Sequence, residues 1–309
     1  MKTTGELQQV HDFWRVEPCG VHFVTDFRDR RDFFAKSREH RYRALWYIPR
    51  LVPFNEASGK SLLEIGCGNG ADGVMFASHG AQYTGVDLTQ TAVDATREHF
   101  QVLGLEGRFQ TEDAERLSFP DASFDVVYSL GVLHHTPNTR RAIEEVYRVL
   151  KPNGKAIIML YHKTSFNYYL RILGYMRLRV LFRILSRLGR WDSDRQKLAG
   201  KSMLELRGNQ SGLVWEAHYK HFLERGWNYL AASNFVHHCT DGPECPIAHV
   251  FTRSSARAAF SMFRAVELKV GHLPLRQYLG KWVPFSMESL AASRFGWALM
   301  IYATKGPPE

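Results

Sequence analysis

The sequence predicts an α/β fold of the Rossmann-like type, with a mostly parallel seven-stranded sheet, helices on both faces and a helical insertion after the fifth strand. Two observations support this prediction. Short apolar runs alternate with helical segments from residue 61 to residue 161, which indicates a parallel sheet covered on both sides. A long helical stretch then precedes two more apolar runs, at 266–272 and 297–303. These runs predict two closing strands, and the last one is a candidate for antiparallel pairing.

The expected elements of the core have recognisable ends. Gly80 and Gly104 end two expected helices, and a turn at 151–154 ends a third, because glycine adopts the backbone conformations that stop a helix. We expect strands at 61–65, 83–87, 108–111, 124–130 and 155–161, and helices at 71–79, 89–103 and 138–150.

The alternation also divides the chain into four segments. Residues 1–60 are expected to form an N-terminal helical cap, and 61–161 a ligand-binding core. Residues 162–265 interrupt the alternation with mostly helical sequence, so we expect a substrate-covering insertion there. Residues 266–309 would return to the core as its closing strands.

Composition limits the classes of partner. The formal net charge is +9, which leaves nucleic acids, anionic membranes and acidic substrates open. No nucleic-acid-binding module is recognisable, so nucleic acid is disfavoured. The four cysteines include no CxxC pair, so we expect no metal site. No signal peptide and no membrane-spanning run are recognisable either, which favours a cytoplasmic location.

The most informative motif follows the first expected strand, where Glu64 precedes Gly66, Cys67 and Gly68. Glycines there let the backbone turn sharply and approach a ligand closely. Dinucleotide-binding enzymes use a similar loop, so the glycines alone do not discriminate. Glu64 does, because a carboxylate suits a cationic ligand better than a pyrophosphate. Cys67 is expected to fill space in the loop without chemistry of its own.

Acidic residues also follow the next two expected strands. Asp87, with Leu88 beside it, ends the second strand, where a carboxylate can accept hydrogen bonds from both hydroxyls of a ribose. Asp113 follows the third strand, where it could accept from an adenine amino group while Ala114 offers its backbone N–H. The three carboxylates therefore predict a nucleoside site at one edge of the sheet.

These motifs resemble the class I S-adenosylmethionine (SAM)-dependent methyltransferase superfamily, in particular the methyltransferase type 11 group that includes ubiquinone and menaquinone C-methyltransferases. The resemblance covers residues 61–161. It implies SAM as the cofactor and Ser129 to Gly131, at the end of the fourth strand, as the wall facing its methionyl part. A group of bacterial methyltransferases also shares Trp14, Pro18-Cys19-Gly20, Tyr161-His162 and Asp241-Gly242-Pro243.

Methyl transfer from SAM is an in-line displacement, for which the protein mainly supplies alignment and excludes water. A base is therefore optional. His134 is the first candidate because it follows the fourth strand, and His162 after the fifth strand is the second. The remaining candidates are His135, Tyr161, His218, His237 and His238.

The insertion contains a basic amphipathic segment at 166–190. It lacks acidic residues, and Arg179, Arg183, Arg187 and Arg190 recur at helical spacing. Such a helix can cover a pocket as a lid, which is the preferred interpretation, or lie on a membrane surface. The loop 241–246 is expected to form either a rigid structural turn or part of an acceptor pocket.

Together these patterns predict a SAM-dependent methyltransferase that acts on a small apolar or aromatic metabolite. Three alternatives stay open. The net charge prompts a tRNA or peptide methyltransferase. An NAD(P)-dependent oxidoreductase would need Ala71 in place of the last glycine of GxGxxG. A SAM-binding protein without activity is the third.

Overall fold

The computed structural model describes residues 3–16, 24–198, 211–280 and 282–307. The chain divides into two compact units, and each is described by itself. The first unit combines residues 1–163 and 250–309, and the second spans residues 164–249. The Pro18-Cys19-Gly20 element lies outside the described residues.

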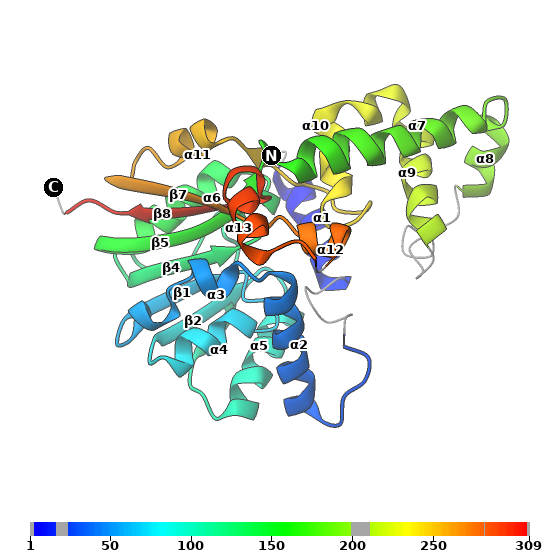
Figure 1. Ribbon diagram of the computed structural model, residues 1–309. Helices are drawn as coiled ribbons and strands as arrows, with labels where there is room; N and C mark the ends of the chain where they lie inside the picture. Colours follow the sequence, from blue (N-terminus) through cyan, green and yellow to red (C-terminus); the bar gives the residue numbers. More distant parts are fainter. Residues whose placement is uncertain (1–2, 17–23, 199–210, 281, 308–309) are drawn as a thin grey trace. The chain divides into compact units, whose positions relative to one another are not determined.

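The first unit is built on the predicted sheet (Figure 1). Its strands follow the order β3-β2-β1-β4-β5-β8-β7. Strands β1 to β5 pair in parallel, whereas β8 runs antiparallel to both of its neighbours. The seven main strands are β1 (Ser61–Ile65), β2 (Gln82–Asp87), β3 (Arg108–Thr111), β4 (Phe124–Leu130), β5 (Leu150–His162), β7 (Ala265–Gly271) and β8 (Ala298–Thr304). The Rossmann-like fold is thus confirmed, with one addition: a short eighth strand, β6 (Val250–Phe251), pairs with β5.

Helices cover both faces of this sheet because successive strand residues point to opposite sides. Leu63 and Ile65 belong to a core that includes Val146 of α6 (Thr139–Val149) and Ala256 of α11 (Arg253–Ala259). On the opposite face, Phe76 packs its ring edge against Tyr128 at 5.0 Å. The other helices of this unit are α1 (Thr3–Val16), α2 (Arg30–Ala44), α3 (Ile48–Leu51), α4 (Ala71–Ser78), α5 (Gln90–Leu103), α12 (Leu275–Leu279) and α13 (Phe285–Phe295).

Helix α5 shows how local sequence fixes an element that positions the site. The Thr89 side chain accepts a hydrogen bond from the Ala92 N–H at its first turn, which satisfies a donor that would otherwise lack a partner. Gly104 ends the helix in the left-handed conformation, with φ of 68°. These two residues set the observed helix bounds close to the predicted ones.

In its described residues the second unit consists of helices joined by turns and loops. It contains a π-helix (Asn167–Met176), α7 (Arg177–Ser186), α8 (Trp191–Leu198), α9 (Ser211–Arg225) and α10 (Ala232–Phe235). It is shorter than the predicted insertion of 162–265, because 250–265 returns to the first unit. Strand β6 and the buried Phe260 explain this difference. Among the described residues, no helix has the length and apolar character needed to cross a bilayer.

Three histidines of the second unit form a buried cluster with the 241–246 loop. The Pro243 carbonyl accepts hydrogen bonds from His221 Nε2 at 2.8 Å and His238 Nδ1 at 2.7 Å. The rings of His221 and His238 stack at 4.4 Å, and His218 Nδ1 lies 2.6 Å from the Tyr229 hydroxyl. The loop is therefore anchored from inside its own unit, as expected of a structural turn.

Candidate functional site

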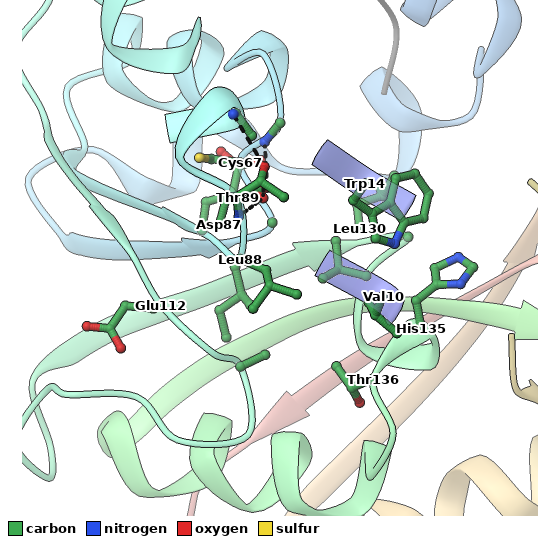
Figure 2. A pocket seen from close by; sticks show the side chains of 18 of the residues that line it. Val10, Trp14, Cys67, Asp87, Leu88, Thr89, Glu112, Leu130, His135 and Thr136 are labelled. Carbon is green, nitrogen blue, oxygen red and sulfur yellow. Dashed lines mark hydrogen bonds between the residues drawn. The ribbon is translucent and has the colours of Figure 1, made fainter. Parts of the chain in front are cut away.

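A cavity lies at the carboxyl ends of β1, β2 and β4, where a parallel sheet of this type binds its ligands (Figure 2). Eight of the nine residues predicted to bind the cofactor line it. They are Glu64, Gly66, Cys67, Gly68, Asp87, Leu88, Asp113 and Ala114. Residues far apart in the sequence thus converge on one space.

The glycine turn is hydrogen-bonded to strand β2 and lies against the side chain of Val132. The backbone N–H groups of Gly66 and Cys67 both donate to the Val86 carbonyl, at 2.7 and 3.0 Å. Gly66 has φ of 81°, and a Cβ there would lie 2.1 Å from Val132 Cγ2. No other residue type fits this position without displacing Val132.

Two other glycines keep the cavity open. Gly68 and Gly131 line it with φ of 56° and 81°, and a Cβ on either would meet no atom within 4 Å. A side chain at these positions would therefore project into free space at the cavity wall. This arrangement suits a ligand that lies directly against backbone.

Glu64 places a buried carboxylate beside the turn. Its Oε2 accepts a hydrogen bond of 2.5 Å from the Tyr83 hydroxyl. Gly73 leaves room for this pair, because a Cβ there would lie 2.5 Å from the Tyr83 oxygen. Burial raises the pKa of Glu64 well above its ordinary value, and the nearby Asp72 carboxylate raises it further. A cation in the cavity would favour the ionised form of Glu64.

Asp87 is held in position by the backbone at the start of α5. Its Oδ1 accepts from the N–H and the hydroxyl of Thr89, both at 3.0 Å, and its Oδ2 accepts from the Gly68 N–H at 3.2 Å. Burial raises the pKa of Asp87, while these hydrogen bonds oppose the rise. Figure 2 shows the hydrogen-bonded Asp87 and Thr89 side chains, with Leu88 nearby. Because Oδ2 accepts only one of these hydrogen bonds and has a second lone pair, Asp87 retains acceptor capacity for a ligand.

Asp113 and Ala114 line the part of the cavity next to the loop after β3. Asp113 Oδ1 accepts from the Glu115 N–H at 2.9 Å, which fixes the carboxylate within the loop after β3. Ala114 is nearly buried. Glu112, which the sequence did not single out, lines the cavity as well.

A buried ion-pair network, which the sequence analysis missed, adjoins the turn. Asp72, in the first turn of α4, accepts two hydrogen bonds from the Arg41 guanidinium of α2, at 3.1 and 2.6 Å. It also accepts from the hydroxyls of Tyr42, at 3.0 Å, and Tyr128, at 2.8 Å. Arg41 and Asp72 both line the cavity. The network therefore connects the N-terminal segment to the helix that follows the glycine turn.

Ser129 is the one predicted cofactor residue that lies outside the cavity lining. Its side chain is fully buried, and its hydroxyl donates to the Ile65 carbonyl at 2.9 Å. Ser129 thus connects β4 to β1, while Leu130 and Gly131 provide the lining. Cys67 does line the cavity, but burial raises the pKa of its thiol well above the ordinary value. This disfavours a reactive thiolate, as expected.

The two histidines predicted to be catalytic, His134 and His162, do not line the cavity. His134 is fully buried, with its ring 3.8 Å from that of Tyr161. His162 is buried as well, with Nδ1 bonded to the Gly296 carbonyl at 3.0 Å, and burial lowers its pKa. The histidine that lines the cavity is His135, because the 3₁₀ turn at Leu133–His135 directs neighbouring side chains differently.

Helix α1 provides an apolar wall, which the sequence analysis also missed. Leu7, Val10 and Trp14 line the cavity, and their spacing of three and four residues places them on one helix face. The Trp14 ring meets that of His135 edge-on at 5.2 Å. Figure 2 shows these two rings side by side, close to Leu130. The spacing of these apolar residues by three and four positions was the signal in the sequence that could have found them.

Comparison with known proteins was informative for the core. Residues 63–158 match the family model of a methyltransferase domain. The chain is 31% identical over 116 residues to the ubiquinone biosynthesis O-methyltransferase of Coxiella burnetii (strain Dugway 5J108-111), a match that covers 38% of this chain and 50% of the relative. It is 41% identical over 101 residues to the phthiotriol/phenolphthiotriol dimycocerosates methyltransferase of Mycobacterium tuberculosis (strain ATCC 25618 / H37Rv), which covers 32% and 37%. The chain thus spans half or less of the length of these curated relatives.

Solved structures support the fold. The PH0226 protein of Pyrococcus horikoshii OT3 superposes with a TM-score of 0.50 at 16% identity, covering 96% of this chain and 99% of that one. A chain from the complex of the Haloferax volcanii Trm112 methyltransferase activator with a methyltransferase has a TM-score of 0.50 at 14% identity, covering 92% and 99%. Residues 63–158 therefore resemble a methyltransferase domain in sequence, and the chain shares the fold of these two structures.

Proposed function

We propose that this protein transfers the methyl group of SAM to a small apolar or aromatic acceptor. The observation that carries the proposal is the convergence of Glu64, Asp87 and Asp113 on one cavity beside an open glycine turn. SAM carries a cationic sulfonium and ammonium and no phosphate. Carboxylates against bare backbone suit it better than they suit the pyrophosphate of NAD(P).

The three carboxylates suggest a role for each part of the cavity. Asp87 would accept the ribose hydroxyls, Asp113 the adenine amino group, and Glu64 would stabilise the cationic end of the ligand. Bound SAM supplies an electrophilic methyl group on a good leaving group. The protein would then align the acceptor and exclude water.

The acceptor class follows from the apolar part of the lining. Leu7, Val10 and Trp14 face the cavity together with Leu130 and Val132. Apolar and aromatic surfaces of this kind bind apolar or planar molecules with few polar contacts. His135 lies beside Trp14, where it would take the proton from an acceptor whose nucleophile carries one. The named relatives act in ubiquinone biosynthesis and on phthiotriol dimycocerosates, which supports a low-molecular-weight acceptor.

Replacing Gly68 with alanine is expected to weaken SAM binding at least about tenfold, since the new Cβ would occupy the open cavity wall. The matched control is Gly104→Ala. Gly104 also has a positive φ, of 68°, with no atom within 4 Å of a Cβ, but it lies at the end of α5. Both variants should lose about 1 kcal/mol of stability from backbone strain. Isothermal titration with SAM and S-adenosylhomocysteine measures the difference.

The titration also tests the proposal itself. No binding of SAM by the unaltered protein at millimolar concentration would refute it, and so would tight binding of a nicotinamide dinucleotide. Equal binding losses in the two glycine variants would exclude a ligand that lies against Gly68.

Incubation with tritiated SAM distinguishes the classes of acceptor. We expect label in the small-molecule or lipid fraction of a cell extract, and none in added RNA or peptides. Label in tRNA or peptide would support that alternative instead. Binding of SAM without label in any fraction would indicate a SAM-binding protein without activity.

A further inference from the structure

The second unit carries a continuous row of exposed apolar side chains, here called the outer stripe. Sixteen large apolar side chains are exposed among the described residues, and eight of them lie between residues 166 and 188. Phe182 is 74% exposed and Leu178 is 64% exposed. The stripe consists of Phe166, Tyr169, Leu170, Tyr175, Leu178, Phe182, Leu185 and Leu188. Such a concentration of apolar surface indicates an interaction site.

The helix geometry makes the stripe continuous. Residues 167–176 form a π-helix that runs directly into α7, and Figure 1 shows α7 within one long helix. Tyr175 follows Leu170 by five residues, which is the hydrogen-bond spacing of a π-helix. Phe182 and Leu185 follow Leu178 by four and seven residues, so in α7 they lie within about 60° of one another. The change in helix type thus aligns both halves on one face.

The opposite face of the same helix is already used for packing. Ile172, Met176, Val180 and Ile184 are buried. Arg183 and Arg187, on the side toward α9, pair with Glu216. The packing within this unit therefore does not use the side chains of the outer stripe.

The charged residues within the segment that carries the stripe are all basic. No Asp or Glu occurs between residues 146 and 191. In the part of the chain that the structure describes, Arg171, Arg177, Arg179 and Arg190 form no ion pair with an acidic side chain, and Arg171, Arg179 and Arg190 are exposed. Arg179 instead lies over the Trp215 ring at 4.7 Å. Its guanidinium is thus held beside the apolar row without neutralisation.

We propose that the outer stripe docks on the surface of an anionic lipid bilayer. A helix with an apolar row, arginines along its flank and no acidic residue lies in the interface, its apolar side chains among acyl chains and its cations among anionic headgroups. Tyrosines such as Tyr169 and Tyr175 suit the same depth, because an apolar ring ends in a hydroxyl. This inference does not depend on the methyl acceptor.

Sedimentation of the full chain with vesicles tests the proposal. We expect binding to vesicles of phosphatidylcholine and phosphatidylglycerol at 3:1, and binding at least about tenfold weaker to phosphatidylcholine alone. The variant Leu178→Glu/Phe182→Glu should bind the anionic vesicles at least about tenfold more weakly. The control Trp282→Glu/Leu290→Glu alters side chains that are 77% and 61% exposed in the first unit, and it should bind like the unaltered protein.

Unchanged circular dichroism and SAM binding verify that both variants fold. No binding to either vesicle by the unaltered protein would overturn the proposal, and so would equal losses in the two variants. Self-association that disappears in Leu178→Glu/Phe182→Glu, without vesicle binding, would identify the stripe as a contact between copies. A raised KM for the acceptor without vesicle binding would identify it as a lid.

Discussion

Replacing Asp72 with alanine is expected to lower the free energy of unfolding by about 3–5 kcal/mol, because the change breaks a buried ion pair by removing one partner. Asp72 is 2% exposed, so the change removes a buried carboxylate and leaves the positive charge of Arg41 without its partner. The hydroxyls of Tyr42 and Tyr128 lose their acceptor at the same time. Urea unfolding followed by circular dichroism gives the value.

A matched control separates this effect from the loss of any carboxylate. Asp94 pairs with Arg97 on α5, but its side chain is 57% exposed, and Asp94→Ala should cost less than about 1 kcal/mol. The Asp72→Ala change should also cost much less in an Arg41→Met background. If it costs the same in both backgrounds, the ion pair is not the source of the stability.

Lowering the pH from 7.5 to 5 is expected to destabilise the second unit by on the order of 5 kcal/mol. Burial lowers the pKa of His218 to about 3, of His221 to about 4 and of His238 to about 2, against about 6.5 in an unfolded chain. The unfolded state therefore takes up protons first as the pH falls. Full stability is present above about pH 6.5 and is lost progressively toward the folded pKa values.

Substitutions can show which histidines cause the pH dependence of the stability. The variant His221→Gln/His238→Gln removes two of the three groups, so its stability should vary less steeply with pH than that of the unaltered protein. His79→Gln, which alters an exposed histidine, serves as the control and should retain the original slope. Hydrogen exchange of peptides from residues 211–249 locates the effect. A slope unchanged in the double variant would contradict this account.

The sheet and most of the cavity lining at the ends of β1 and β2 could be predicted because both depend on local pattern. Apolar runs fix the strands, and the chain direction in a parallel sheet brings the ends of β1 and β2 to one edge. Glu64, Asp87 and Asp113 needed no further information. The boundary at residue 250 was missed because β6 has only two residues, too few to produce a periodic signal.

The remaining cavity residues could not be predicted, because that requires the direction of each side chain. Ser129 and Leu130 are neighbours in β4, and strand alternation sends one toward β1 and the other into the cavity. His134 and His135 are also neighbours, but they lie in a 3₁₀ turn, and only the His135 side chain lines the cavity. Asp72 was overlooked because its partner Arg41 lies 31 residues away, and only tertiary packing brings them together.

The contact between Gly66 and Val132 has a consequence for how such proteins diverge. The space for a Cβ at position 66 is already filled by the valine side chain, so the two positions cannot vary independently. A lineage that acquires a larger residue at 66 must first lose bulk at 132, and even then the positive φ opposes it. The glycine turn after β1 and the loop after β4 are thereby coupled mechanically, and displacement of one would be transmitted to the other.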